Sequence, residues 1–209
     1  MTNKHCDSRT EDLASSDTLG FVLAGGKSSR MGQDKGQLCI GERDLVSLAC
    51  DVLIKSGVDN VVVSSNHIES ALADKVANCG PLSAIHSIVH EPIAAHYQGM
   101  VVLPVDMPLI DSEQLRLLRQ YGQSHETTCC YQQSYLPAYI PFTQQLSQFI
   151  EEQLSSRCYA FKLLLAKLQF KQLALQPSSN QNAQLSPFYN INTPEQWLTF
   201  KQSAQRRFS

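Results

Sequence analysis

Three glycines and three cationic side chains share one short segment near the start of the chain, residues 23–35, which read Leu-Ala-Gly-Gly-Lys-Ser-Ser-Arg-Met-Gly-Gln-Asp-Lys. The glycines are Gly25, Gly26 and Gly32, and the cations are Lys27, Arg30 and Lys35. Glycine lets a backbone approach a ligand closely and point its N–H groups at phosphate oxygens, and the cations supply countercharge. This composition predicts a loop that binds the phosphates of a nucleoside triphosphate.

The position of this loop supports the same interpretation. An apolar run, residues 19–23, precedes it and is typical of a buried parallel strand, and such strands present ligands at their carboxyl ends. The loop lacks the Gly-Lys-Ser/Thr ending of a P-loop and the glycine spacing of a dinucleotide fingerprint. The alternative, a glycine-rich surface turn with solvated cations, fits less well because a strand pattern precedes the segment and a helical pattern follows it.

A carboxylate stands at the end of a second apolar run. Residues 99–105 read Gly-Met-Val-Val-Leu-Pro-Val and predict a strand, with Asp106 at its carboxyl end. A carboxylate in that place suits Mg²⁺, a hard cation that keeps several waters and bridges phosphate oxygens. The alternative is that Asp106 caps the next helix, but Asp111 and Ser112 are better placed as caps.

Four segments together resemble the MobA-like nucleotidyltransferases. Besides residues 23–35 they are residues 80–85, Gly-Pro-Leu-Ser-Ala-Ile, residues 103–109, Leu-Pro-Val-Asp-Met-Pro-Leu, and residues 190–195, Asn-Ile-Asn-Thr-Pro-Glu. They follow the family's order and span residues 19 to about 200. The resemblance implies an α/β fold, a single Rossmann-like three-layer α/β/α domain with a mostly parallel sheet. It also implies the guanylyltransferase branch, whose substrates are GTP and molybdopterin-bound molybdenum, with Mg²⁺ as cofactor.

The resemblance also assigns site residues. Those assigned to the nucleotide are Leu23, Ala24, Gly25, Gly26, Lys35, Ser64, Asp74 and Asp106. Those assigned to catalysis are Arg30, Lys35 and Asp106, with Asp106 as the metal ligand. Ser64 stands where relatives often carry an asparagine that contacts the nucleotide, and Asn66 is close enough to replace it. Ser83-Ala84 stands where relatives usually have Ala-Gly.

The acceptor side is assigned more broadly. Asn190 and Asn192 are one residue apart in an extended segment, so they point to the same side and can hydrogen-bond the pterin or its phosphate. The alternative for both is a turn before the last helix. A predicted helix with Arg157, Lys162 and Lys167 offers cations to the acceptor's phosphate.

Nucleotidyl transfer explains the absence of a catalytic triad from the sequence. The attacking phosphate oxygen is already ionised near neutral pH, since its second pKa is about 6, so no general base is needed. Five of the six histidines are more typical of solvated or capping residues than of ligands. They are His67, His86, His90, His96 and His125.

Composition restricts the other function classes. A net charge of −2 and a pI near 6.3, with scattered cations, exclude nucleic acid as an expected partner. The seven cysteines show no zinc-ligand spacing, and Cys50, Cys129 and Cys130 are expected in the core or in strands. No apolar run reaches about 18 residues, so we expect a cytoplasmic protein without membrane contact. Residues 1–17 predict a disordered tail, and residues 18–209 the nucleotidyltransferase domain.

The expected elements alternate between strands and helices through the first half of the chain. They are a helix over 45–53 ending near Ser56-Gly57, a strand over 58–64, a helix from 80, a strand over 99–105, a helix from Asp111 or Ser112 to about 121, strands over 127–131 and 136–140, two helices within 143–168, a strand over 170–175, a polar loop over 177–187, and a last helix capped by Thr193 and Gln196.

Two other functions remain open at this level. One is a cytidylyltransferase or another nucleotidyltransferase of this fold that acts on a sugar or alcohol phosphate. The other is a non-catalytic nucleotide-binding module, which retention of both Lys35 and Asp106 disfavours. A carrier of the molybdenum cofactor, or the molybdoenzymes that receive it, would be further partners.

Overall fold

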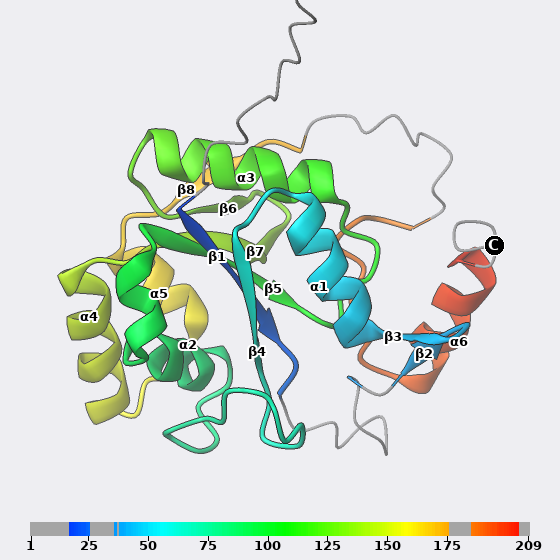
Figure 1. Ribbon diagram of the computed structural model, residues 1–209, viewed down its shortest axis with the longest axis horizontal. Coiled ribbons are helices and arrows are strands. Elements are labelled where there is room, and N and C mark those ends of the chain that lie inside the picture. Colours follow the sequence, from blue (N-terminus) through cyan, green and yellow to red (C-terminus); the bar gives the residue numbers. More distant parts are fainter. Residues whose placement is uncertain (1–16, 26–35, 37, 176–184, 205–209) are drawn as a thin grey trace, which may run out of the picture.

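The computed structural model describes residues 17–25, 36, 38–175 and 185–204 (Figure 1). The strands are β1 (Thr18–Leu23), β2 (Cys39–Ile40), β3 (Arg43–Asp44), β4 (Asn60–Ser64), β5 (Gly99–Pro104), β6 (Cys129–Tyr131), β7 (Ser134–Pro141) and β8 (Lys171–Leu173). The helices are α1 (Leu45–Lys55), α2 (Pro81–Val89), the 3₁₀ helix η2 (Pro92–His96), α3 (Ser112–Ser124), α4 (Gln144–Ser155), α5 (Phe161–Lys167) and α6 (Pro194–Ala204). The expected tail over residues 1–17, apart from Asp17, and most of the polar loop over 177–187 lie outside the described residues.

Six strands form one sheet in the order β4-β1-β5-β7-β6-β8. The pairs β4–β1, β1–β5 and β6–β8 are parallel, whereas β5–β7 and β7–β6 are antiparallel. The parallel part holds the first three long strands of the chain, which are joined through α1 and α2. The expectation of a mostly parallel sheet is therefore confirmed.

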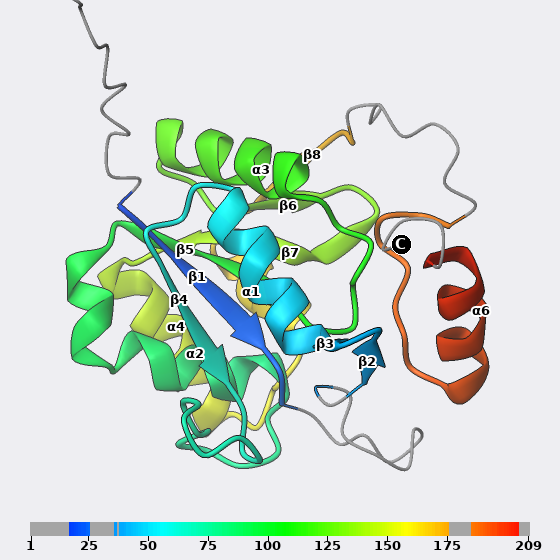
Figure 2. The same cartoon turned by 45° about the vertical axis from the view of Figure 1, so that its right-hand side comes forward.

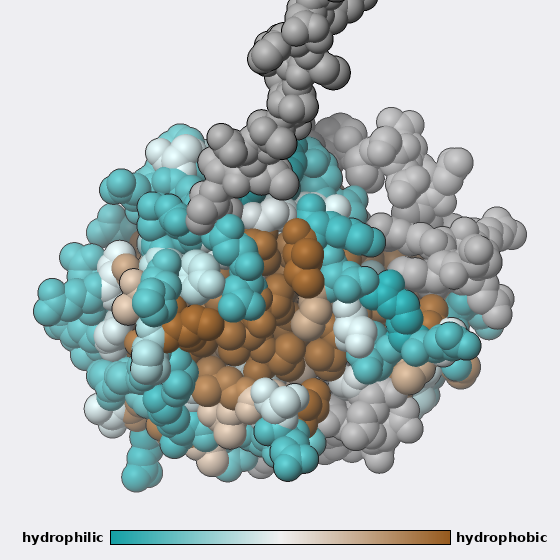
Figure 3. Space-filling view, in the orientation of Figure 1, coloured by the Kyte–Doolittle hydropathy of each residue, from teal (hydrophilic) through white to brown (hydrophobic). Residues whose placement is uncertain are grey.

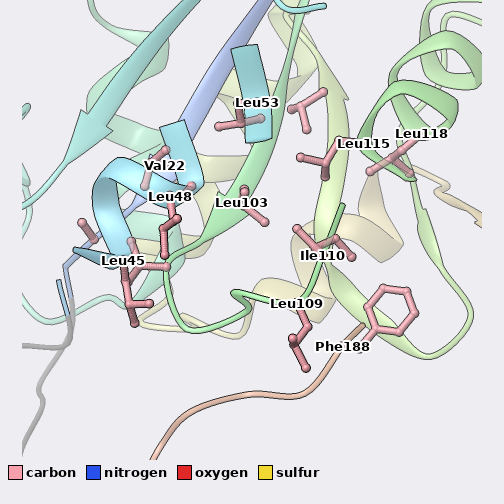
Figure 4. Close-up of a cluster of buried hydrophobic side chains, with 14 of the residues drawn as sticks. Val22, Leu45, Leu48, Leu53, Leu103, Leu109, Ile110, Leu115, Leu118 and Phe188 are labelled. Atoms are coloured by element: carbon pink, nitrogen blue, oxygen red, sulfur yellow. The ribbon is translucent and has the colours of Figure 1, made fainter. Parts of the chain in front are cut away.

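Side chains alternate between the two faces of the sheet, and each face is covered by its own helices. Phe21 of β1 packs with Ile85 of α2 and Ile150 of α4, and α5 belongs to the same layer. Val22, the next residue, faces α1 and α3 instead. Figure 4 shows this second cluster, where the labelled residues are Val22, Leu45, Leu48, Leu53, Leu103, Leu109, Ile110, Leu115, Leu118 and Phe188. Helices on both faces confirm the three-layer α/β/α fold, and Figure 2 shows the two helical layers from the side.

The boundaries of the expected elements shift by a few residues. The second strand begins at Asn60 rather than Val58, because Val58 packs into the core and the Asp59 N–H donates to Thr18 O at 3.1 Å. The helix after Asp111 runs to Ser124 instead of about Tyr121. The hairpin of β2 and β3 was not predicted, since two-residue strands are too short to show a period.

β4 forms one edge of the sheet, and apolar side chains gather along it. Val61, Val62 and Val63 are half-buried there, and Ile54 of α1 is exposed nearby. Figure 3 shows hydrophobic residues along the middle of this face, between more polar surfaces on both sides. This hydrophobic surface lies along β4, the edge strand of the sheet.

Membrane spans require a long apolar helix, and none of the helices in the described ranges meets that requirement.

The start of α3 provides a test of its capping residue. Asp111 Oδ1 accepts from the Gln114 N–H at 2.9 Å, and Gln114 Oε1 accepts from the Asp111 N–H at 3.0 Å. We expect Asp111→Ala to lower the free energy of unfolding by about 1 kcal/mol, because alanine cannot accept the hydrogen bond from the Gln114 N–H. Ser112→Ala is the control and should change stability by less than about 0.5 kcal/mol. Equal losses in the two variants in a urea titration would refute the assignment of Asp111 as the cap.

Candidate nucleotide site

The carboxyl ends of three neighbouring strands are held in line. The Ala24 N–H donates to Ser64 O at 2.9 Å, which joins the end of β1 to the end of β4. The Val105 N–H donates to Leu23 O at 3.1 Å, which joins the end of β1 to the end of β5. From β1 the chain crosses through α1 to β4 on one side, and then returns through α2 to β5 on the other side. Ligands of open α/β sheets bind at such a change of direction, outside the strand ends.

The loop after β4 folds back and brings Asp74 to the end of that strand. Asn66 Nδ2 donates to Asp74 Oδ2 at 3.0 Å, and Asn66 Oδ1 accepts from the Asp74 N–H at 2.8 Å. The Ser65 N–H also donates to Leu72 O at 3.0 Å, as part of a bridge between the two sides of the loop. Asp74 is thus held by Asn66, two residues beyond the end of β4, while the last residue of that strand, Ser64, bonds to Ala24.

Two serines of α2 hold the same loop from behind. Ser87 Oγ accepts from the Lys75 N–H at 2.7 Å, and Ser83 Oγ donates to Val76 O. They are four residues apart, so they lie on one face of the helix. Ser83 and Ser87 therefore tie the loop that carries Asp74 to α2. Gly80, just before α2, has φ +60° and ψ −143°, a conformation open in practice to glycine alone.

On the other side of β1, Asp106 meets the segment before the last helix. The Ile191 N–H donates to Asp106 O at 2.9 Å. Ile191 is fully buried, whereas Asn190 and Asn192 on either side of it are half-buried. The alternation is that of an extended segment with its apolar residue turned into the core. Asp106, Asn190 and Asn192, assigned to the metal and the acceptor, are thus brought into one place.

This segment is anchored at both ends. Phe188 packs against Tyr131 with ring centroids 5.3 Å apart, and the Tyr131 hydroxyl donates to Gln114 O at 2.8 Å. At the other end Thr193 Oγ1 accepts from the Gln196 N–H at 3.3 Å, while Gln196 Oε1 accepts from the Thr193 N–H at 3.1 Å. The capping box expected at Thr193 is confirmed. The helix and the ring contact fix the stretch between them against Asp106.

With this geometry in view, comparisons with known proteins become informative. A model of the MobA-like NTP transferase domain matches residues 20–165, well over half of the chain. The chain belongs to this family. It is 34% identical over 183 residues to a molybdenum cofactor guanylyltransferase of Xanthomonas euvesicatoria, which covers 85% of this chain and 91% of that protein. It is 27% identical over 192 residues to a probable molybdenum cofactor guanylyltransferase of Pelotomaculum thermopropionicum, with 84% and 87% coverage.

Among solved structures, the molybdopterin-guanine dinucleotide biosynthesis protein A of Archaeoglobus fulgidus superposes with a TM-score of 0.70 at 18% identity, covering 90% of this chain and 99% of that one. At this identity the likeness shows the fold. The MobA-like fold expected from the sequence is thus confirmed, and the chain is a nucleotidyltransferase.

Several residues of the MobA-like loop fall outside the described part of the chain. They are Gly26, Lys27, Arg30, Gly32 and Lys35. Residues on both sides of the loop are described. Gly25, before it, is exposed, and Leu38, after it, is a core residue whose carbonyl oxygen accepts from the Leu45 N–H at 3.0 Å. The roles expected for Arg30 and Lys35 stay predictions.

The sequence left open whether Ser64 or Asn66 supplies the polar side chain at the end of β4. Ser64 is 1% exposed, and its carbonyl is engaged by the Ala24 N–H. Asn66 is exposed and contacts Asp74 through both ends of its amide. The geometry therefore favours Asn66 as the polar side chain of this corner, with Ser64 acting through its backbone.

The cations expected to share one helix do not form one surface. Arg157 lies in the turn between α4 and α5, with φ +54°. Lys162 and Lys167 both lie on α5, but five residues apart, which turns them about 140° from each other. Lys162 is placed over the ring of Tyr135, and Lys167 donates to Glu152 at 2.7 Å.

The cysteines expected in the core or in strands occupy such positions. Cys129 and Cys130 lie on β6 and are fully buried. Burial raises the pKa of the Cys129 thiol to about 12 and that of Cys130 to about 11. The pKa of Cys50, on α1, is also raised, first by burial and then by Asp51 and Asp44. Because the thiolate is the nucleophile, these three thiols are unreactive near neutral pH.

Enzymes of the MobA-like family generally use a divalent metal ion, and Asp106 fits one of the Mg²⁺ type. Asp106 is half-buried and lies two residues after the end of β5, one of the strand ends that form the site. Among the described residues, three side chains close enough to share an ion occur only at His86, His90 and Glu151. Asp106 is thus not part of a cage of protein ligands there. Mg²⁺ is commonly held by one or two carboxylates together with waters and substrate phosphates, which suits this arrangement.

Proposed function

We propose that this chain transfers GMP from GTP to molybdopterin-bound molybdenum cofactor, forming the guanine dinucleotide cofactor and releasing pyrophosphate. The observation that carries the proposal is the Ile191–Asp106 hydrogen bond of 2.9 Å. It supports the proposal because it joins the segment assigned to the acceptor to the main chain of the residue assigned to the metal, just after β5, the strand that pairs with β1. Relatives that cover most of the chain carry the name molybdenum cofactor guanylyltransferase.

The chemistry is an in-line displacement at the α-phosphorus of GTP. An ionised oxygen of the acceptor's phosphate forms a new bond to this phosphorus, while the bond to the oxygen that bridges to the β-phosphate breaks. The electron pair leaves with pyrophosphate, and no side chain has to remove a proton. What the chain supplies is positioning and positive charge around crowded phosphates.

Each part of the site takes a share of this work. Leu23, Ala24 and Gly25 bring the backbone at the end of β1 against the nucleotide, and Asn66 orients Asp74 toward it. Arg30 and Lys35 neutralise the phosphates that leave. Mg²⁺, held by Asp106, supplies further charge neutralisation at the phosphate oxygens when bound.

Release of pyrophosphate tests the proposal directly. The full chain is supplied with Mg²⁺ and molybdopterin-bound molybdenum, and GTP is compared with CTP, ATP and UTP. We expect release with GTP at least tenfold faster than with the other three. Selectivity for CTP would move the chain to the cytidylyl branch, and binding of GTP without any release would favour a non-catalytic nucleotide-binding module.

The contact between Asn66 and Asp74 leads to a second expectation. Asn66→Ala removes both hydrogen bonds that hold Asp74, each worth about 1 kcal/mol, so the KM for GTP should rise about tenfold with little change in kcat. Asn60→Ala, at the opposite end of β4, is the matched control and should leave KM unchanged. An unaltered KM in the Asn66 variant would contradict a nucleotide role for this corner.

Three further expectations belong to the same proposal. The protein works in the cytoplasm, where GTP is available. Its partners include a carrier of the molybdenum cofactor or the molybdoenzymes that receive the product. Residues 18–209 make up the catalytic domain. Pull-down of a molybdoenzyme from an extract supplied with the product would test the partner assignment.

A further inference from the structure

Three potential metal ligands meet on the outer surface of the layer formed by α2 and α4. His86 Nε2 lies 3.0 Å from Glu151 Oε1, and His90 Nε2 lies 3.5 Å from the same oxygen. One potential ligand atom from each of the three residues lies within 4.8 Å of the other two. Two ligands of a tetrahedral Zn²⁺, with bonds of about 2.0–2.1 Å, are about 3.3 Å apart. Modest rotation of the side chains brings this cluster to that spacing.

The contact of His90 Nδ1 indicates which nitrogen of this ring can bind a metal ion. His90 Nδ1 lies 2.8 Å from the carbonyl oxygen of His86. A carbonyl only accepts, so Nδ1 carries a hydrogen and the neutral ring presents the lone pair of Nε2 to the Glu151 carboxylate. Two acceptors facing each other require a positive species between them, which is either a proton on Nε2 or a bound metal ion. A backbone carbonyl that holds the far nitrogen is also the usual way in which proteins orient a histidine ligand.

The neighbouring lysines pair with other carboxylates rather than with Glu151. Lys75 pairs with Glu91 at 2.9 Å, and Lys167 pairs with Glu152 at 2.7 Å. The ion pairs recorded for Glu151 are those with the two histidines. The side chain of His86 is 12% exposed, whereas those of His90 and Glu151 are 39% and 54% exposed. An ion can therefore enter from solvent and keep a water as its fourth ligand.

We propose that His86, His90 and Glu151 bind a divalent transition metal ion, Zn²⁺ above all, that fastens α2 to α4. Two imidazoles and one carboxylate form a ligand set that zinc uses in proteins, whereas Mg²⁺ prefers oxygen ligands alone. The site differs from that of Asp106 in ligands and in metal. Its histidines lie in the last turn of α2 and at its C-cap, with His90 about 13 Å along the helix axis from Pro81 at the start. This proposal departs from the expectation that His86 and His90 are solvated or capping residues rather than ligands.

The test is a calorimetric titration of the full chain with Zn²⁺ in the presence of excess Mg²⁺, which occupies sites of oxygen ligands. We expect one equivalent to bind at micromolar concentration or tighter. His90→Asn and Glu151→Gln should each weaken binding about tenfold or more. His96→Asn, an exposed histidine of η2, is the matched control and should bind as the unaltered chain does. Zn²⁺ should also raise the Tm of the unaltered chain and of His96→Asn, and should raise that of Glu151→Gln clearly less.

Co²⁺ in place of Zn²⁺ gives a readout of ligand type. Nitrogen and oxygen ligands should produce a d–d absorption without a thiolate charge-transfer band, and His90→Asn should abolish it. A thiolate band would assign the ion to a cysteine and overturn the proposal. Equal affinity in all variants, or saturation only at millimolar metal, would overturn it as well. The exposed positions of His90 and Glu151 keep the variants foldable, and circular dichroism verifies this.

Discussion

Replacing Asp106 with asparagine is expected to lower kcat for GTP-dependent pyrophosphate release about a thousandfold. The amide keeps the size of the side chain but not its charge, so the carboxylate that we propose as the ligand of the divalent metal is lost just after β5. Charge stabilisation by a metal on a phosphoryl oxygen is worth several kcal/mol, and each 1.36 kcal/mol corresponds to a factor of ten in rate. Ile191 contacts the backbone carbonyl of Asp106, so this contact survives the substitution.

Asp111→Asn is the matched control for this experiment. It removes a carboxylate from the same connection between β5 and α3, but asparagine caps a helix as well as aspartate does. We expect its kcat to stay within twofold of that of the unaltered chain. Thermal unfolding should show that both variants fold. A kcat for Asp106→Asn within tenfold of the unaltered value would exclude Asp106 as the metal ligand of the reaction.

The sequence was most informative where a ligand demands a local pattern. The strand before Gly25, the turn at Gly80 and the strand before Asp106 were all predicted, because apolar runs, glycines and a terminal carboxylate are local signals. The capping box at Thr193 was found for the same reason, since its partners are three residues apart, and the cap of α3 was predicted as Asp111 or Ser112.

Contacts between distant segments carried no such signal. Nothing in the spacing shows that the Ile191 N–H reaches Asp106 O, or that Glu151 of α4 meets the two histidines of α2. The family resemblance did place Asn190 and Asp106 in one site, but only as an assignment. Lys162 and Lys167 show the reverse case, because their nearness in sequence suggested a common cationic surface that helical geometry rules out.

Gly122 of α3 is the position where a single methyl group should do the most harm to stability. The helix lies so close to β7 that an added Cβ would fall inside the contact distance of the Tyr139 ring, against atoms near its base. The ring has no room to move away, because its hydroxyl oxygen packs closely against Gly99. A Cβ atom added to Gly99 would lie only 2.6 Å from that oxygen. Tyr139 is 1% exposed and is thus held between two glycines.

Two effects of opposite sign compete in Gly122→Ala. Alanine favours an interior helical position over glycine by about 1 kcal/mol. Forcing extra volume into a well-packed core costs about 1–3 kcal/mol and occasionally more, and here the neighbour is a buried ring without room to turn. We expect the clash to prevail, with a net loss of about 2 kcal/mol and a Tm lower by about 6 °C, since about 1 kcal/mol shifts a chain of this size by 2–4 °C.

Gln120→Ala, two residues earlier on the exposed side of α3, is the control and should change the free energy of unfolding by less than about 0.5 kcal/mol. The double variant Gly122→Ala with Tyr139→Leu supplies the decisive comparison, because leucine vacates the space that the new methyl group needs. The two losses should then be less than additive by at least about 1 kcal/mol. If Gly122→Ala instead stabilises the chain, helix propensity outweighs packing, and α3 does not press on Tyr139 in solution.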